Sequence, residues 1–118
     1  MDLPALQIEL RAFAAARHWQ PFHTPKNLSA ALMVEAAELL EIFQWMTPEA
    51  SQAAHQNPAT KTQIADELAD VLLYLLQVAD HCQIDLPAAV ASKLVKNAIK
   101  HPAPDHAPAR PKDNARDD

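Results

Sequence analysis

Hydrophobic residues along this chain recur every three or four positions, the spacing that places them on one face of an α-helix. Near the start of the chain, Leu6, Leu10 and Phe13 follow this spacing. The chain contains no glycine and few β-branched residues, and its ten prolines separate the periodic segments from one another. This pattern predicts an all-α protein.

Prolines and polar capping residues set the predicted helix boundaries. Asn27 is the predicted N-cap of the second helix. Thr47 followed by Pro48 is expected to open a short turn of helix, and residues 55–60 are expected to form a loop. The main helices are predicted at residues 4–17, 27–46, 61–82 and 85–100.

The length of 118 residues suits one domain with a modest core. We expect a compact four-helix bundle-like domain over residues 1–102. Residues 103–118 alternate prolines with charges and contain no large apolar side chain. They are predicted to form a disordered tail, because such a composition cannot build a core.

The second and third predicted helices carry large apolar residues on several faces. Leu40 lies away from the main stripe of the second helix, and Leu72, Leu73 and Leu76 are expected on the outer side of the third. Four helices are too few to cover all of these side chains. We therefore expect a homo-oligomer, either a dimer or a tetramer.

Acidic residues are concentrated in the middle of the chain. Residues 27–86 hold nine aspartates and glutamates but a single base, Lys61, and the whole chain has a net charge of −5. Such a segment repels nucleic-acid phosphates, so stable nucleic-acid binding is not expected. The apolar runs are too short to span a membrane, and the N-terminal residues do not resemble a secretory signal. Cys82 is the only cysteine, which excludes an intrachain disulfide and fits a cytoplasmic protein.

Two of the predicted helices place a pair of acids against their apolar stripe. At about 100° per residue, Glu35 falls within the stripe of the second helix and Glu38 at its edge. Glu67 and Asp70 repeat this arrangement on the third helix. An ExxE pair on one helix is thus matched by an ExxD pair on the next.

A carboxylate among apolar side chains needs a partner or a proton, because burial without one is costly. Lys61 cannot serve four acids, so carboxylates converging from two helices would repel one another unless a cation joined them. Hard oxygen ligands on rigid helices suit Mg²⁺ or Mn²⁺, and magnesium also takes substrate phosphates as ligands. The alternative is that the acids lie on solvated faces, which is the preferred interpretation for Glu41, Asp66 and Asp80.

Three stretches of the chain carry a more specific likeness. FHTPKNLSAALMVEAAELLEIFQW, DELADVLLYLLQVADHCQIDL and SKLVKNAIKHP resemble the all-α nucleoside triphosphate pyrophosphohydrolases of the MazG type, in particular the small dCTP pyrophosphatase branch. The likeness extends over residues 10–102 and well beyond the acidic pairs.

The resemblance implies that Glu35, Glu38, Glu67 and Asp70 bind Mg²⁺. It also implies cleavage of a (deoxy)nucleoside triphosphate, a dCTP-like pyrimidine dNTP, between the α- and β-phosphates, with release of the monophosphate and pyrophosphate. Such an activity would serve housecleaning of the nucleotide pool. Glu35 and Glu38 are the expected catalytic carboxylates, with Glu38 as the group that takes a proton from the attacking water.

A triphosphate needs donors beyond the metal. Lys93, Asn97 and Lys100 share one face of the fourth predicted helix, and the resemblance places the lysine and the asparagine at the active site. These three residues are the predicted phosphate-binding group. The alternative is a solvated basic face.

A nucleobase needs a flat apolar slot. Trp19, Trp45 and Tyr74 fall in the segments that carry the resemblance and are predicted to stack on the base. His23 matches a histidine of the family and joins this predicted base-binding group. Ordinary core packing is the alternative for each of the four.

Two departures from the mammalian members of the branch affect base recognition. They have a histidine where this chain has Leu10, and glycines and an aromatic residue in the connection that spans residues 47–60 here. Another triphosphate, such as dUTP, a modified nucleotide or phosphoribosyl-ATP, is therefore an open alternative. A di-iron protein is disfavoured because no glutamate is followed three residues later by histidine. A non-catalytic helical interaction module is the remaining alternative.

Overall fold

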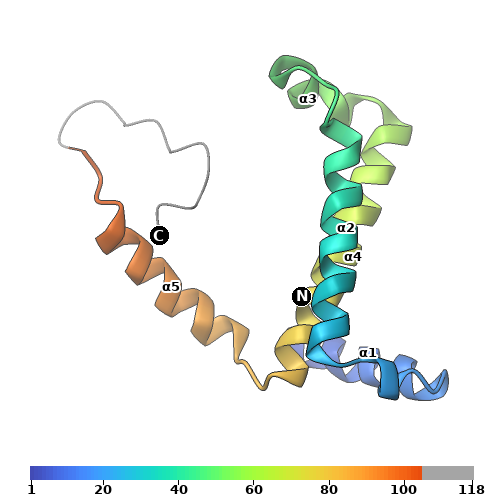
Figure 1. The fold of residues 1–118 in the computed structure, drawn as a ribbon. Helices are drawn as coiled ribbons and strands as arrows, with labels where there is room; N and C mark the ends of the chain where they lie inside the picture. The colour runs from blue at the N-terminus through green and yellow to red at the C-terminus, as the bar shows by residue number, and fades with distance from the viewer. Residues whose placement is uncertain (105–118) are drawn as a thin grey trace. The chain divides into compact units, whose positions relative to one another are not determined.

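The computed structural model describes residues 1–104, and every regular element in this range is a helix (Figure 1). The α-helices in chain order are α1 (Leu3–Ala16), α2 (Pro25–Phe43), α3 (Pro48–Ala53), α4 (Pro58–His81) and α5 (Leu86–Lys100). Two short 3-10 helices, η1 (Gln20–Phe22) and η2 (Ala54–Gln56), follow α1 and α3. The predicted all-α class is confirmed. Of the predicted tail, residues 105–118 lie outside the described residues.

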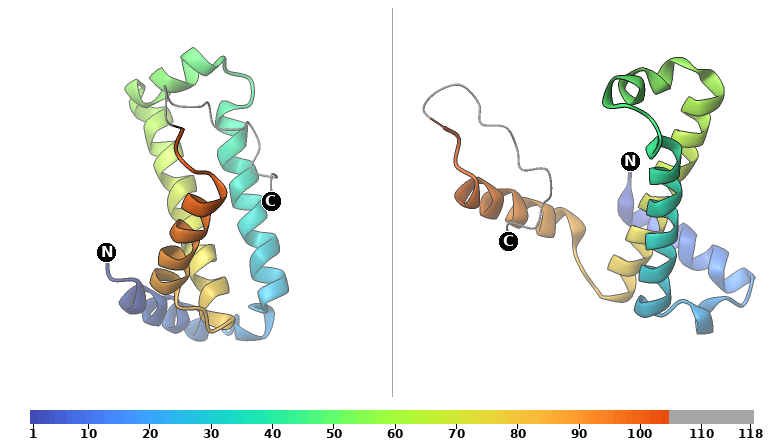
Figure 2. Two further views of the ribbon diagram at one scale, coloured as in Figure 1. Left: turned by 90° about the vertical axis from the view of Figure 1, so that its left-hand side faces the viewer. Right: turned by 45° about the horizontal axis from the view of Figure 1, so that its top comes forward.

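The chain divides into two compact units, Met1–Ile84 and a second that begins at Asp85. In the first unit, α2 and α4 run antiparallel and pack against each other (Figure 1, Figure 2). α1 packs against α4, near the end of the pair where α2 begins, and α3 and η2 connect the opposite ends. The second unit contains α5. The domain limits at residues 1–102 stay a prediction.

Each α-helix begins after a polar side chain that accepts a hydrogen bond from a backbone N–H of the first turn, and each has proline at its first or second position. Both features satisfy or remove donors that a helix start would leave unpaired. The five N-caps are Asp2, Thr24, Thr47, Asn57 and Asp85.

The N-cap predicted for the second helix was wrong. Thr24 Oγ1 accepts from the backbone N–H of Asn27 at 3.2 Å, so the cap lies three residues before the predicted one and α2 begins at Pro25. The Asn27 side chain instead donates to the carbonyl oxygen of Phe22 at 3.0 Å, which ties η1 to the start of α2. α4 likewise begins at Pro58 and not at residue 61, because Asn57 caps it.

α1 and α4 end in the same motif, with a residue in the left-handed region. His18 has φ 56° and Gln83 has φ 55°. In each case the next backbone N–H donates to a carbonyl one turn back, from Trp19 to Ala14 and from Ile84 to Ala79. This is the Schellman arrangement, which glycine usually occupies. Because the chain has no glycine, histidine and glutamine take this conformation instead.

The core of the first unit is small and lies where the helices meet. Leu28 of α2 and Leu76 of α4 are 1% and 0% exposed. Gln7 of α1 donates to the carbonyl oxygen of Leu76 at 3.1 Å, and Arg11 pairs with Asp80. α1 therefore lies against the C-terminal part of α4.

Two expectations for α4 are corrected by the packing of the helices. Leu76, expected on an outer face, is fully buried, and Leu72 and Leu73 are half-buried. Asp80, expected to be solvated, accepts two hydrogen bonds of 2.6 Å from Arg11. Leu40 is 61% exposed, as expected. Among the described residues, none of the helices has the length and apolar character that crossing a membrane requires.

Candidate active site

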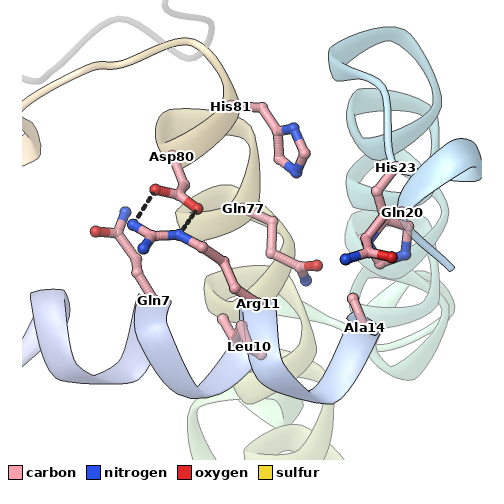
Figure 3. Close-up of a pocket in the computed structure, with 9 residues that line it drawn as sticks. All are labelled: Gln7, Leu10, Arg11, Ala14, Gln20, His23, Gln77, Asp80 and His81. Carbon is pink, nitrogen blue, oxygen red and sulfur yellow. Dashed lines mark hydrogen bonds and ion pairs between the residues drawn. The ribbon is translucent and has the colours of Figure 1, made fainter. Parts of the chain in front are cut away.

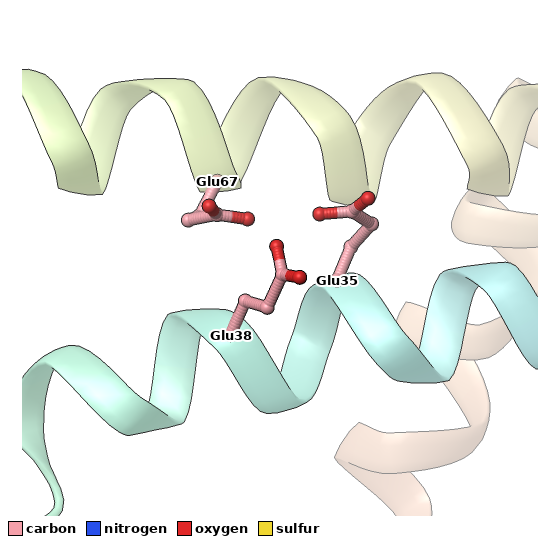
Figure 4. A group of neighbouring side chains, drawn as sticks. All are labelled: Glu35, Glu38 and Glu67. Carbon is pink, nitrogen blue, oxygen red and sulfur yellow. The ribbon is translucent and has the colours of Figure 1, made fainter.

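Three of the predicted metal ligands meet between α2 and α4. Figure 4 shows Glu35 and Glu38 on α2 and Glu67 on α4, with all three side chains in the space between the helices. One carboxylate oxygen from each lies within 4.8 Å of the other two. Glu67 is 29 positions from Glu38 along the chain, and it reaches the other two residues because α2 and α4 pack side by side.

The local reason for this convergence is helical spacing. Glu35 and Glu38 are three residues apart on α2, so they project from adjacent turns of one face. Glu67 lies near the middle of α4, on the side that packs against α2. α2 and α4 are 19 and 24 residues long and contain no glycine, so they hold these side chains on regular helical backbone.

The electrostatics of the cluster reflect crowding of like charges. Burial raises the pKa of Glu35 to about 7, and the neighbouring Glu67, Glu38 and Asp70 add to this rise. Burial also raises the pKa of Glu67, an effect reinforced by Glu38 and Asp70 and opposed by Glu35. Glu35 is therefore partly protonated near neutral pH.

The cluster has the donor set of a divalent-cation site. Glu35 Oε2 and Glu67 Oε2 are buried and have no hydrogen-bond partner among the described residues. Buried polar atoms without a partner are rare, and each one carries a desolvation cost. A hard cation would satisfy both atoms and relieve the repulsion, so these residues fit Mg²⁺ or Mn²⁺.

Asp70, the fourth predicted ligand, lies one turn beyond Glu67 on α4 and is half-buried. It is outside the group of three whose oxygens converge. Its charge nevertheless raises the pKa values of both Glu35 and Glu67. Asp70 also lines a cavity beside the cluster, so this residue lies between the acidic cluster and that cavity.

This neighbouring space, here called the aromatic cavity, has a volume of about 340 Å³. The rings of Phe13 and Trp19 meet edge to face with their centroids 5.7 Å apart. The ring centroids of Trp19 and His23 are 6.0 Å apart. The Schellman turn at His18 places Trp19 here, because it reverses the chain directly after α1. The lining residues are Leu6, Glu9, Leu10, Phe13, Trp19, His23, Asp70, Leu73, Tyr74 and Gln77.

The aromatic cavity thus brings together three of the four predicted base-binding residues, Trp19, His23 and Tyr74, with Asp70. The fourth, Trp45, follows the end of α2, is 91% exposed and does not line the cavity. Leu10, where the resemblance suggested a change in base recognition, does line it.

A second cavity of about 290 Å³, here called the polar cavity, adjoins the first (Figure 3). The two share Leu10, His23 and Gln77. The remaining lining residues are Gln7, Arg11, Ala14, Gln20, Asp80 and His81. Gln77 was not among the predicted site residues, although its position three residues after Tyr74 places it on the same helix face.

The predicted phosphate-binding residues belong to the second unit. Lys93, Asn97 and Lys100 lie on α5 at positions that share one helix face. Their role in phosphate binding stays a prediction.

Comparison with known proteins bears on this site. The model of the MazG-like family matches residues 30–110, which include all four predicted metal ligands. The chain belongs to the MazG-like family.

The relatives of this MazG-like chain carry names that describe a reaction. Human dCTP pyrophosphatase 1 is 44% identical over 91 residues, which cover 77% of this chain and 54% of the human protein. The bovine protein of the same name is 41% identical over 90 residues, which cover 76% of this chain and 53% of that protein. The chain therefore spans about half the length of the curated relatives it matches.

A solved structure matches more completely. The crystal structure of a pyrophosphatase from Archaeoglobus fulgidus shares 40% sequence identity with a TM-score of 0.78. The match covers 84% of this chain and 91% of the archaeal one. The fold of this MazG-like chain is thus the fold of that protein, and the predicted resemblance is confirmed.

Proposed function

We propose that this MazG-like chain is a Mg²⁺-dependent nucleoside triphosphate pyrophosphohydrolase. It would cleave a dCTP-like pyrimidine dNTP between the α- and β-phosphates to the monophosphate and pyrophosphate, and so remove surplus or non-standard nucleotides from the pool. The observation that carries the proposal is the convergence of Glu35, Glu38 and Glu67, with two buried unpartnered oxygens, beside the aromatic cavity. The printed names of the relatives support the same reaction class.

Glu35, Glu38, Glu67 and Asp70 would hold the metal, with Mn²⁺ as a possible replacement for Mg²⁺. A bound divalent cation would neutralise triphosphate charge and favour ionisation of a water molecule. Glu35 must release its proton to become a ligand, because its raised pKa keeps it partly protonated near neutral pH.

The remaining chemistry would fall to the side chains around the substrate. Glu38 would accept a proton from the water that attacks the α-phosphorus, while the bond from this phosphorus to the bridging oxygen breaks and pyrophosphate leaves. Trp19 and Tyr74 would stack on the base, with His23 at the edge of the slot. Trp45 is kept as a base-binding candidate that would act across an interface between chains.

Lys93, Asn97 and Lys100 would bind the phosphates. Lysine and asparagine side chains supply the donors that phosphate oxygens require, and the three residues share one face of α5. Their participation requires that α5 of this chain or of a second copy reach the acidic cluster.

A homo-oligomer, dimer or tetramer, is part of the proposal. On α5, Val90, Leu94 and Ile99 are 54%, 64% and 76% exposed. On α2, Met33 and Leu40 are 68% and 61% exposed. Exposed apolar side chains in such number on two helices are typical of surfaces that pack against another chain. The acidic middle of the chain supports the expectation of no stable nucleic-acid binding, and the single cysteine supports a cytoplasmic location.

Hydrolysis of each common dNTP and NTP, and of 5-methyl-dCTP, tests the proposal. The purified protein would be incubated with each nucleotide with and without Mg²⁺, and the products would be separated by anion-exchange chromatography. Monophosphate and pyrophosphate are expected only with the metal, with a rate lowered at least about 100-fold in Glu35→Gln and Glu67→Gln, the loss typical of removing a key charge. Glu41→Gln, an exposed acid on α2, is the matched control and should retain activity.

Two other results would redirect the proposal. Metal binding without turnover of these nucleotides would indicate a specialised substrate such as phosphoribosyl-ATP. Neither turnover nor metal binding would contradict the proposal and favour a helical interaction module.

A further inference from the structure

Gln77 lies at the boundary between the aromatic cavity and the polar cavity, and it lines both. It is on α4, one turn beyond Tyr74, and is half-buried. Figure 3 shows its side chain extending from α4 into the polar cavity, toward Gln20 and His23. An uncharged polar side chain at this position can reach a group held against the aromatic residues.

The orientation of the Gln77 amide is decided by a hydrogen bond. Gln77 Nε2 donates to the backbone carbonyl oxygen of Leu73 at 3.2 Å. A carbonyl oxygen only accepts, so the amide nitrogen must face Leu73 and the amide oxygen must face away from it. Gln77 therefore offers an acceptor, Oε1, at the boundary of the two cavities, with the amide held in place by its own helix.

The rest of the aromatic cavity agrees with this polarity. Glu9 and Asp70 also line it, and both accept hydrogen bonds when ionised. Within the described residues its lining includes no lysine or arginine, and Leu10 offers no hydrogen-bonding group. The cavity's charged side chains are therefore acceptors only, which favours a ligand whose own edge carries donors.

We propose that Gln77 is a specificity-determining residue, whose Oε1 accepts a hydrogen bond from the exocyclic amino group of a base stacked between Trp19 and Tyr74. This inference rests on the proposed function for the site. An amino base such as cytosine presents an N–H donor where uracil presents a carbonyl acceptor. Uracil would place that acceptor against Oε1 and leave both unpaired, so the site would favour the amino base.

Binding of the two monophosphates tests the inference without hydrolysis. dCMP and dUMP carry the same phosphate and sugar, so the ratio of their Kd values measured by calorimetry isolates the base. The wild-type protein should bind dCMP about tenfold more tightly than dUMP, the factor for one hydrogen bond of about 1.4 kcal/mol. Gln77→Met has a similar length but no acceptor, and should bring the ratio close to one.

Two further variants separate recognition from packing. Gln20→Met makes the same change in the polar cavity, outside the aromatic cavity, and should keep the wild-type ratio. Gln77→Glu keeps acceptor oxygens at this position and should still prefer dCMP. A circular dichroism melt of each variant confirms that it is folded.

The outcomes distinguish this inference from the proposed function. A dCMP preference that disappears in Gln77→Met supports the inference even if the triphosphates are not hydrolysed. Equal binding of dCMP and dUMP by the wild type, a preference unchanged in Gln77→Met, or no binding of either nucleotide would overturn it, whatever the hydrolysis assay shows.

Discussion

Glu35 sits at the centre of the acidic cluster, and its titration links stability to metal binding. Its pKa is raised from 4.5 to about 7 in the folded chain, chiefly by burial. Between these two values the unfolded chain has released this proton while the folded chain retains it. The contribution of Glu35 to the stability of the metal-free protein is therefore fully present below pH 4.5 and is lost as pH rises from 4.5 to about 7.

Glu35→Gln should remove this pH dependence in part. In metal-free buffer at pH 7.5 the variant is expected to melt about 5 °C above the wild type, because an amide can occupy the site without charge. Added Mg²⁺ should raise the Tm of the wild type but not of the variant. Thermal melts by circular dichroism from pH 4.5 to 8 measure both effects.

Glu41→Gln is the control for this prediction, since Glu41 is an exposed acid on the same helix. Its Tm should stay close to that of the wild type at every pH. A Glu35→Gln variant that melts below the wild type at pH 7.5, or that responds equally to Mg²⁺, would contradict the account of the cluster.

At the scale of the helices, the C-terminal ends of α1 and α4 place residues other than glycine in the left-handed region. Gln83 has φ 55° and His18 has φ 56°, a conformation that a side chain with a Cβ adopts at a cost. The N-terminal ends of the five α-helices carry no such conformational cost, because each combines a polar cap with a proline at the first or second position. Stability can therefore be gained at the C-terminal ends.

Gln83→Gly should raise the free energy of unfolding by about 1 kcal/mol, because glycine adopts the left-handed region without strain. The same exchange at Gln63, an exposed position inside α4, should lower it by about 1 kcal/mol. Urea denaturation of the two variants measures both values. A loss of stability in Gln83→Gly would show that its side chain makes a contribution larger than the strain.

At the scale of the whole molecule, the described chain exposes more apolar surface than its small core accounts for. Within residues 1–104, Leu28 and Leu76 are the only side chains exposed by 1% or less. Leu94 of α5 is 64% exposed, and similar side chains lie on α2. The proposed homo-oligomer would remove such side chains from water.

The wild-type protein should therefore have a mass by light scattering that is a multiple of 13.0 kDa. Leu94→Glu should weaken self-association at least about tenfold, since a charge would be buried in an apolar contact. Ser92→Glu is the control, because a residue two positions away lies about 200° around the helix, on the other side. A monomeric wild type would contradict the proposal of an oligomer.

Much of the fold followed from local chemistry that the sequence displays directly. Helical periodicity, the absence of glycine and the placement of prolines determined the all-α class and the approximate position of every long helix. The acidic pairs on two helices were likewise visible, because the position of a side chain around a helix depends only on its number. Asn27 was mistaken for a cap because Thr24 competes for the same role three residues earlier.

Only the tertiary structure decided which of these faces meet. The antiparallel packing of α2 and α4 brings Glu67 to Glu35 and Glu38, and the packing of α1 against α4 pairs Asp80 with Arg11. The docking of separate helices also decided that Gln77 of α4 lines the two cavities together with residues of α1. A residue's angle on its own helix is local information, whereas its neighbours across an interface depend on how separate helices dock.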